Sequence, residues 1–307
     1  MGAEVESERL ALASPSEAAA FRHEAALASY VHRMGSPGDY RTAVYVRDAL
    51  LHAGWDARLV TYDVPIAVPT EQRLTLLGTT AKELDLYEAT IPGDASSAEH
   101  AAIGIPYSGY SNDGDVSGRV VYANYARPED FAELSKAGVD VRGAIVVARV
   151  GKGALTAKAF EAATHGALAT LVFSDPMDGG YFKGDPYPAG PWRPTSGALR
   201  NTMTFTNAPG DPTAIGIPVP GAPHKPFSAI KLPTIPEMPV TGDVARELIA
   251  RMGGPVAPPE WHGGFALPLH LGGNLRAHFV LRSKRTFGPI WDVIARLRGS
   301  DPSQEVV

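Results

Sequence analysis

The fold of this chain is decided by residues 144–175, which read AIVVARVGKGALTAKAFEAATHGALATLVFSD. The segment AIVVARV is a run of branched apolar residues, which is typical of a buried strand. The turn GKG precedes ALTAKAFEAATHG, whose apolar residues recur at helical spacing and which ends at Gly166, and TLVFSD is a second apolar strand. A strand, a helix and a strand in this order predict a right-handed crossover between parallel strands, and therefore a mixed α/β fold.

The N-terminal side of this unit has a helical pattern. Residues 16–30 predict one helix and residues 39–54 a second, stronger one, because apolar side chains form a single stripe in each. Residues 56–66, DARLVTYDVPI, predict a strand. Pro65 and Pro69 follow and indicate a change of domain.

From about residue 73 the pattern changes to short strands, including RLTLLG, GRVVYANYA and GAIVVARVG. Residues 175–220 contain many Gly and Pro residues and no periodicity, which predicts a long ordered loop of the kind that binds something. Residues 241–254 predict a helix with Thr241 as its N-cap and Gly253 or Gly254 as its C-cap, and residues 274–283 predict a strand.

The composition excludes several classes of protein. The 307 residues have 44% hydrophobic and 20% charged side chains, which fits a soluble globular chain of one large or two ordinary domains. A net charge of -5 without a long basic run does not support nucleic-acid binding. The sequence has no cysteine, no apolar run of the roughly 18 to 20 residues that cross a bilayer, and no signal-peptide pattern. As written it predicts a cytoplasmic product without a membrane span.

Common catalytic motifs are absent. VGKGAL lacks the third glycine of a dinucleotide loop and the spacing of a Walker loop, so a tight strand-to-helix turn is the better interpretation. The sequence contains no HExxH, no His-x-Asp and no GxSxG motif. His262, His270 and His278 are eight residues apart, which places them on separate turns or strands and does not favour a metal site.

Acidic residues give no catalytic pair either. Asp113 with Asp115, and Glu129 with Asp130, have the positions of turn and helix-start residues. Asp175 follows a parallel strand, where sites are often found, but the sequence shows no partner for it. The residues alone therefore do not predict a catalytic centre.

The C-terminal residues 292–307, DVIARLRGSDPSQEVV, predict a strand over 293–297, a turn at GSDPSQ and the opening of a further strand at EVV. Strands usually have about five or six residues. We therefore expect this last strand to continue beyond the sequence.

The order of these segments resembles the N-terminal half of the glutamate carboxypeptidase II and transferrin receptor family of zinc-peptidase relatives. Each matching stretch is short, but their number and collinear order are specific. The matching stretches are HRMGSPGDYRTAVYVRDALLHAGWDARLVTYDV, GRVVYANYARPEDFAEL, GAIVVARVGK, GALATLVFSDPMDGGYFKGDPYPAGPWRP, GDPTAIGIPV, ELIARMGGPVAPPEW and DVIARLRGSDPSQEVV.

The resemblance implies a β-rich, protease-associated apical domain inserted in an incomplete zinc-peptidase α/β domain. The implied parts are residues 1–70 of the peptidase domain, an apical domain over residues 71–283, and a return strand over residues 284–307. In the family, the zinc ligands and the general base lie beyond the position of QEVV. The resemblance thus implies no catalytic residue, metal ligand or cofactor in this chain, and zinc, with calcium as a further possibility, only in a full-length parent.

The resemblance also implies a function and partners. The chain would be the non-catalytic, substrate-access and structural half of a zinc-dependent exopeptidase of carboxypeptidase or aminopeptidase type, inactive alone. Its partners would be the missing peptidase half or a complementing chain, and a peptide substrate of the parent. The alternatives are a stand-alone protease-associated module that binds protein or peptide partners, and an independent enzyme with an unrecognised site.

Substrate contacts follow from the same resemblance. The family arginine that binds the substrate carboxylate corresponds to Leu155, which cannot form a charge-assisted pair, so glutamate preference is not expected. The family asparagine corresponds to Thr202, which keeps one hydroxyl, and we take Thr202 and Arg200 as candidate substrate-binding residues. The family calcium site uses carbonyls that match Ala214 and Ile217, but its carboxylates lie outside this chain, so no calcium is predicted here.

Overall fold

The computed structural model describes residues 2–203 and 210–299, with side chains from residue 6 onward. The chain forms two compact units. Unit 1 comprises the residues up to Tyr62, Asp94–Ile103 and the residues from Pro289 onward. Unit 2 comprises Asp63–Gly93 and Gly104–Gly288. The predicted limits at residues 70 and 283 stay predictions.

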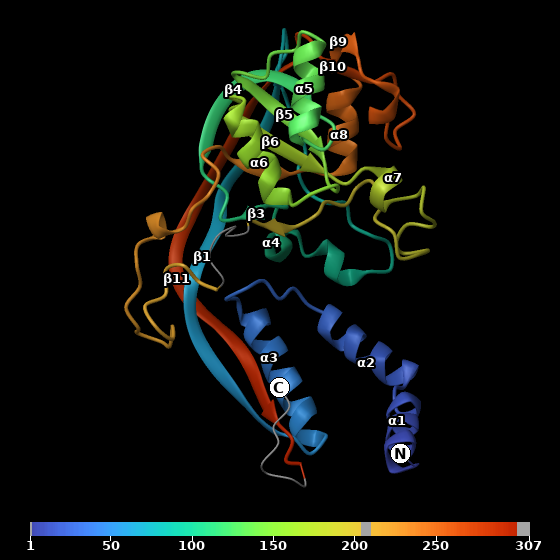
Figure 1. The fold of residues 1–307 in the computed structure, drawn as a ribbon, viewed down its shortest axis with the longest axis vertical. Helices are drawn as coiled ribbons and strands as arrows, with labels where there is room; N and C mark the ends of the chain where they lie inside the picture. The colour runs from blue at the N-terminus through green and yellow to red at the C-terminus, as the bar shows by residue number, and fades with distance from the viewer. Residues whose placement is uncertain (1, 204–209, 300–307) are drawn as a thin grey trace. The chain divides into compact units, whose positions relative to one another are not determined.

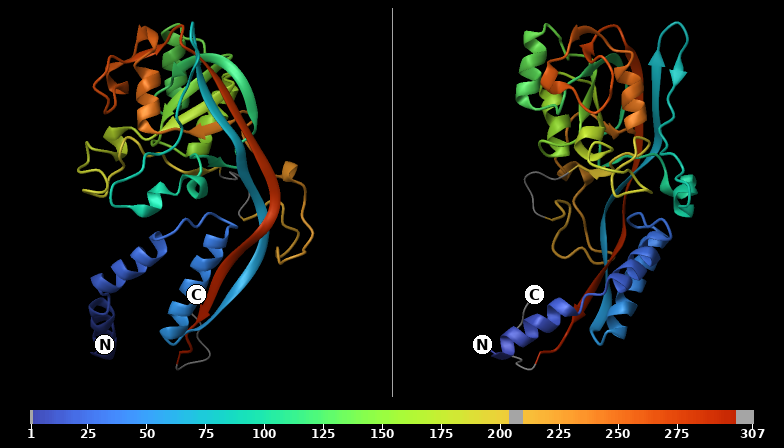
Figure 2. Two further views of the ribbon diagram at one scale, coloured as in Figure 1. Left: turned by 180° about the vertical axis from the view of Figure 1, so that it is seen from behind. Right: turned by 90° about the vertical axis from the view of Figure 1, so that its right-hand side faces the viewer.

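A seven-stranded mixed sheet has the strand order β2-β1-β11-β4-β5-β6-β8. Strands β4, β5, β6 and β8 are parallel to one another, whereas β11 is antiparallel to β4 and β2 is antiparallel to β1. Figures 1 and 2 show β1 in blue and β11 in red, side by side. The strands are β1 (Asp56–Leu77), β2 (Lys82–Glu83), β4 (Gly114–Tyr122), β5 (Ala144–Arg149), β6 (Ala169–Phe173), β8 (Glu237–Pro239) and β11 (Arg276–Arg296).

The crossover predicted for residues 144–175 is confirmed. Every residue of β5 and β6 is buried, and helix α6 (Leu155–Thr164) connects the two strands. Their parallel register runs from the Ile145 and Ala169 pair to the Arg149 and Phe173 pair. The apolar strands are covered on both sides, which explains why they lack the alternation of a half-exposed strand. The mixed α/β class follows.

Two further helices pack on the parallel strands, as Figure 1 shows for unit 2. Helix α5 (Pro128–Lys136) contributes Phe131 and Leu134 to the core, and helix α8 (Gly242–Ile249) contributes Val244 and Leu248. Thr241 caps α8 by accepting a hydrogen bond from the Val244 amide, as predicted. The helix ends at Ile249 and its C-cap is Ala250 rather than Gly253 or Gly254.

Small elements complete unit 2. A parallel ladder joins β3 to β7, with Ser108 opposite Asn201 and Gly109 opposite Thr202. An antiparallel ladder joins β9 to β10. The bounds are β3 (Ser108–Gly109), β7 (Asn201–Thr202), β9 (Gly253–Val256), β10 (His270–Gly272), α7 (Pro176–Gly179), η2 (Phe227–Ala229) and η3 (Pro259–Trp261).

The strands predicted over residues 56–66 and 73–78 are one strand, β1, that continues through Pro65 and Pro69. Only Thr75 and Leu76 of β1 pair with β2, so the prolines lie where one side of β1 has no ladder partner among the described residues. A proline is tolerated at such an edge because no ladder amide is required. The strand predicted over residues 274–283 likewise continues, as β11, to Arg296.

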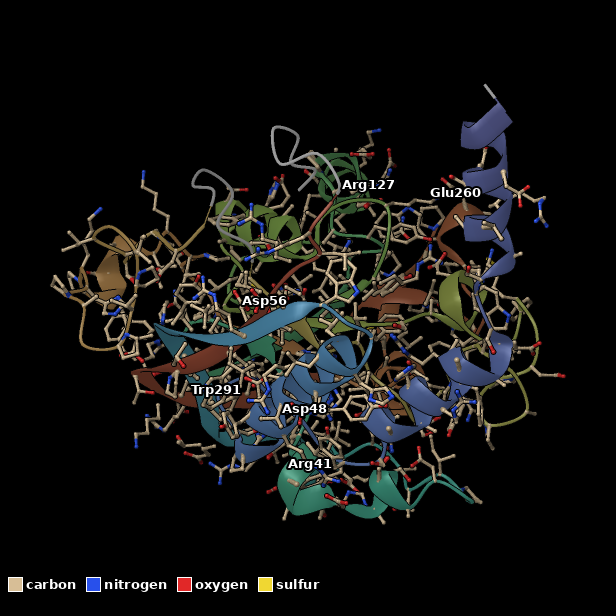
Figure 3. All side chains as sticks on the ribbon, turned by 90° about the horizontal axis from the view of Figure 1, so that it is seen from below. Arg41, Asp48, Asp56, Arg127, Glu260 and Trp291 are labelled. Atoms are coloured by element: carbon tan, nitrogen blue, oxygen red, sulfur yellow. The ribbon has the colours of Figure 1, made fainter. Side chains whose placement is uncertain are left out.

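Unit 1 is mainly helical, with α1 (Gly2–Ala13), α2 (Glu17–Ala28) and α3 (Pro37–His52). The two predicted helices are confirmed, with Ser16 and Ser36 as N-caps of α2 and α3. The ring of Tyr40 contacts Trp291 of β11 edge to face at 5.0 Å, and Figure 3 labels Trp291. Unit 1 also contains η1 (Ala95–Ala98) and α4 (His100–Ile103). The predicted EVV strand lies outside the described residues.

Candidate functional site at the carboxyl edge of the sheet

The carboxyl ends of β4, β5 and β6 meet at one edge of the parallel sheet in unit 2. Polar residues gather there: Asn124 and Tyr125 follow β4, Arg149 ends β5, and Asp175 follows β6. Ligands commonly bind at this edge of α/β sheets because loops from several strands converge on it. This edge is therefore the candidate site.

Arg149 is the central cation of the site and its side chain is only 2% exposed. Its Nη2 donates to Asn124 Oδ1 at 2.5 Å, and its Nη1 lies 3.8 Å from Asp178 Oδ2. The guanidinium also stacks 4.2 Å from the centroid of the Tyr125 ring. Its Nε is buried and makes no hydrogen bond to any described residue. A buried guanidinium held in this way can fix an anionic group with little reorganisation.

Tyr125 connects the strand ends to the loop that follows β6. Its hydroxyl donates to Asp178 Oδ1 at 2.9 Å and lies 3.0 Å from Oδ2. Burial and then the bond to Asp178 raise the pKa of Tyr125 to about 12, so the phenol stays protonated and continues to donate. The Lys152 ammonium lies 4.8 Å from the ring centroid. The aromatic ring is thus surrounded by cations that its electron-rich face stabilises.

Lys158 of α6 is buried and fixes the strand-to-helix turn. Its Nζ donates to the carbonyl of Tyr125 at 2.5 Å and to that of Gly151 at 3.0 Å. Burial lowers the pKa of Lys158 to about 8. In this turn Gly151 has a φ of 109° and Gly153 a φ of 138°, conformations that favour glycine. The predicted role of VGKGAL as a tight turn is confirmed.

Asp175 is buried and has two hydrogen-bond partners, although the sequence shows none. Its Oδ1 accepts hydrogen bonds from the Met177 amide at 2.9 Å and the Gly264 amide at 2.6 Å. Burial raises the pKa of Asp175, and these two bonds oppose that change. The second partner is 89 residues away in sequence, so no local pattern could have revealed it. Asp175 thus holds two loops together and does not face the cavity described next.

A surface cavity of about 730 Å³ opens beside this cluster. Arg193 contributes to its wall and donates to Ser174 Oγ at 2.7 Å. Burial lowers the pKa of Arg193. The wall combines one cation, two carboxylates and several apolar rings, which suits a peptide side chain with neighbouring polar groups. The residues that line the cavity include Glu88, Ile91, Asp178, Tyr187, Trp192 and Arg193.

Of the two predicted substrate-binding residues, Arg200 is bonded to a residue of the cavity wall, and Thr202 lies two positions further along the chain in β7. Arg200 is exposed, and its Nη2 donates to Glu88 Oε2 at 2.7 Å and to the Gly104 carbonyl at 3.1 Å. Glu88 itself lines the cavity. Thr202 is exposed on β7, opposite Gly109. The substrate roles of Arg200 and Thr202 stay predictions.

The three evenly spaced histidines are dispersed. His270 Nδ1 lies 2.9 Å from the Gly254 carbonyl, and His278 Nε2 lies 2.7 Å from Asp115 Oδ1. Within residues 2–203 and 210–299, no three His, Asp or Glu side chains are grouped so that they could hold a metal ion. The described residues therefore do not fit a zinc ion, and we assign no chemical step through one.

Of the two acidic pairs, Glu129 and Asp130 start a helix as predicted, whereas the turn predicted at Asp115 is wrong, because Asp115 lies in β4 opposite Val280 of β11. Asp130 lies in the first turn of α5 and accepts the Arg127 amide at 3.0 Å. Asp113 pairs with Arg285 at 3.0 Å, and Asp115 with His278 and Arg282. In the region that corresponds to the family calcium site, the Ile217 carbonyl accepts a hydrogen bond from the Val219 amide at 2.9 Å. The absence of calcium stays a prediction.

The chain is similar to several known proteins. The sequence profile of the PA domain matches residues 116–219. Human transferrin receptor protein 2 is 34% identical over 205 residues, which cover 66% of this chain and 25% of that protein. A probable glutamate carboxypeptidase VP8 of Zea mays is 30% identical over 292 residues, which cover 92% of this chain and 37% of that protein.

Among solved structures, a zinc aminopeptidase of Bacillus subtilis covers 89% of this chain and 46% of its own, with a TM-score of 0.46 and 12% identity. The chain is a protein with a protease-associated (PA) domain. It is a relative of transferrin receptor 2 and the glutamate carboxypeptidases, as its sequence predicts. It spans between about a quarter and somewhat over a third of these relatives' length. None of the described helices is long and apolar enough to cross a membrane.

Proposed function

We propose that this chain is the non-catalytic, substrate-access and structural part of a zinc-dependent exopeptidase, of carboxypeptidase or aminopeptidase type. The zinc-bearing part would come from further residues of a longer protein or from a second chain. The relationship to glutamate carboxypeptidases supports peptide hydrolysis as the class of reaction. The described residues contain no group of side chains that could hold a metal ion, which supports placing the zinc site in another part of the protein.

The observation that carries the proposal is the exposed apolar surface of unit 1. Among its described residues, the buried hydrophobic side chains are those of Ala43 and Ala57. In contrast, Leu12 is 76% exposed and Phe21 is 73% exposed. A helix with an apolar stripe normally packs that stripe on a partner. The other large exposed hydrophobic residues of unit 1 are Leu10, Met34, Tyr40, Leu51, Trp55, Ile294 and Leu297.

The cavity in unit 2 supports a peptide as the substrate. Ile91, Tyr187 and Trp192 give it apolar walls, and Glu88 and Arg193 supply charges of both signs. Leu155, at the start of α6, offers no cation to a substrate carboxylate. The proposed substrate is therefore a peptide whose terminal residue is not selected for an acidic side chain.

The intact mass of the native protein, purified from its own source, tests this proposal. The expected result is a species well above the 32.4 kDa of this chain, or a complex with a second chain, that contains zinc and hydrolyses peptides. A native species of 32.4 kDa without a zinc-bearing partner would contradict it. The isolated chain is expected to self-associate through the apolar surface of unit 1.

A stand-alone binding module is the second candidate, because unit 2 has a continuous buried core of its own. This function requires the isolated chain to be monodisperse. Two measurements distinguish the binding module from the peptidase part: size-exclusion chromatography with light scattering, and thermal unfolding. A stable monomer with one cooperative transition would favour the binding module, whereas concentration-dependent association favours the peptidase part.

A further inference from the structure

Glu237, the first residue of β8, is a completely buried carboxyl group away from the candidate site, with a relative exposure of 0%. Its Oε1 accepts a hydrogen bond from Ser108 Oγ of β3 at 2.9 Å. Its backbone amide donates to Ser111 Oγ at 2.8 Å. Its Oε2 is buried and has no hydrogen-bond partner among the described residues.

Two other side chains beside Glu237 also have unpaired buried atoms. Thr170 of β6 is its register partner, so the two side chains lie on the same face of the sheet, and Thr170 Oγ1 has no described partner. Asn201 of β7 lies close enough to lower the pKa of Glu237, although its Nδ2 completes no hydrogen bond. A buried polar atom without a hydrogen bond lowers the stability of the fold. Among the described residues, three such atoms belong to this cluster: Glu237 Oε2, Thr170 Oγ1 and Asn201 Nδ2.

The charged group that faces Glu237 is Lys158 of α6, which is itself 2% exposed. The side chains that face Glu237 from β3, β6 and β7 are those of Ser108, Thr170 and Asn201, which are uncharged at ordinary pH. The protonation of the cluster therefore depends on two residues, Glu237 and Lys158. An ionised buried carboxylate is unfavourable unless its solvation is replaced by several good partners.

Glu237 is joined to the segment that contains Arg200 and Thr202. Ser108, its hydrogen-bond partner, is in β3, and β3 pairs with β7. The ladder continues with the Met203 amide, which donates to the Gly109 carbonyl at 2.8 Å. Loosening of the Ser108 contact would thus be transmitted to the whole β3–β7 ladder.

We propose that Glu237 is a proton-controlled latch: its neutral acid form keeps the β3–β7 ladder closed on the sheet, and its ionisation loosens the ladder. The neutral form carries a proton on one oxygen, so no charge is buried, while the other oxygen still accepts a hydrogen bond from Ser108. The ionised form is stabilised by water, which reaches it only when the ladder opens. This inference concerns unit 2 alone and does not rest on the proposed peptidase role.

The direction of the effect follows from linkage. Burial raises the pKa of Glu237 to about 7 from an ordinary value of 4.5, against the lowering effects of Ser108, Lys158 and Asn201. In an opened ladder the carboxyl group is hydrated and its pKa returns toward the ordinary value. Proton binding therefore favours the closed ladder, and the closed form loses this advantage as the pH rises from about 4.5 to 7. Lys158 contributes in a separate window above its pKa of about 8.

Amide hydrogen exchange on the full chain tests the latch. With intrinsic exchange rates corrected for pH, the protection of the Met203 amide should fall by about ten-fold or more between pH 5 and pH 8, since each unit of pKa difference is worth a factor of ten. The Val146 amide in the centre of β5 is the internal control and should not change in this way. Equal protection of Met203 at both pH values would overturn the proposal.

The matched variant is Glu237→Gln, which keeps the shape and cannot ionise. Its Met203 protection should be independent of pH in this range, and a pH dependence equal to that of the wild-type chain would overturn the proposal. A measurement on the wild-type chain is independent of whether the variant folds. The carboxyl carbon of Glu237, followed by NMR, should titrate near pH 7 together with the change in Met203 exchange, whereas an ordinary midpoint near 4.5 would overturn it.

Discussion

Tyr125 and Asp178 are joined by a hydrogen bond in which the phenol faces both carboxylate oxygens, at 2.9 and 3.0 Å, although the two residues are 53 positions apart. The same carboxylate lies 3.8 Å from Arg149, which stacks on the Tyr125 ring. The carboxyl edge of the sheet is therefore held by one connected network of a phenol, a guanidinium and a carboxylate. Such networks rigidify a site through their paired members, and Arg149 Nε is the atom of this network that has no hydrogen bond to a described residue.

Removal of the phenol should weaken this network. Tyr125→Phe keeps the ring and its stacking on Arg149 but leaves Asp178 without its hydroxyl donor. A hydrogen bond to a charged group is worth about 1.5 to 3 kcal/mol, and the Asp178 side chain is 32% exposed, so the free energy of unfolding should fall by about 1 to 2 kcal/mol. Urea unfolding measures it. Tyr40→Phe in unit 1, which keeps the ring contact with Trp291, is the control and should change it by less than about 0.5 kcal/mol.

Replacement of the buried cation should have a larger effect. Arg149→Met leaves the buried Asn124 and the partly exposed Asp178 without their partner, so the expected loss is about 2 to 4 kcal/mol of unfolding free energy. Arg142→Met is the matched control, because Arg142 pairs with Asp140 while its side chain is 79% exposed. We expect about 0.5 kcal/mol or less for the control. Similar losses for both variants would contradict the role of Arg149.

Lys158 should make the stability of the chain depend on pH in the alkaline range. Its pKa falls from 10.5 in the unfolded chain to about 8 in the folded one, so the unfolded chain binds more protons between these values. Stability from this group therefore rises with pH across that window. Lys158→Met removes the effect. The difference in unfolding free energy between wild type and variant should be larger at pH 10 than at pH 8, and a constant difference would count against it.

The metal prediction concerns the isolated chain. Because the described residues present no group of metal ligands, titration with zinc in a calorimeter should show no stoichiometric binding, and a peptidase panel with added zinc should show no turnover. Stoichiometric binding that His262→Ala or His270→Ala abolishes would reveal ligands that the fold brings together and would contradict the proposed division of roles.

Arg200 can be tested in the native, full-length protein once its peptide substrate is known. Arg200→Gln removes the ion pair with Glu88 at the border of the cavity, and we expect KM to rise by roughly three- to ten-fold with a smaller change in kcat. Thr202→Ala should act in the same direction and more weakly. Arg251→Gln, at the exposed end of α8, is the control. An unchanged KM in both test variants would remove Arg200 and Thr202 from the substrate contacts.

The sequence by itself determined the local elements. The apolar runs around the GKG turn determined β5, α6 and β6, because a buried parallel strand and an amphipathic helix each have a distinct pattern over a few residues. The N-cap at Thr241 was readable for the same reason. The collinear order of the segments also indicated the relationship to the glutamate carboxypeptidases.

Only the tertiary structure decided which residues share a site. Asp175 meets Gly264, Tyr125 meets Asp178 and Glu237 meets Ser108 across 89, 53 and 129 residues of sequence. It also decided that β1 continues through Pro65 and Pro69, because a proline is compatible with a strand edge and the edge is a property of the whole sheet. Periodicity reports the environment of a residue along its own element, whereas burial of a charge depends on neighbours that only folding brings together.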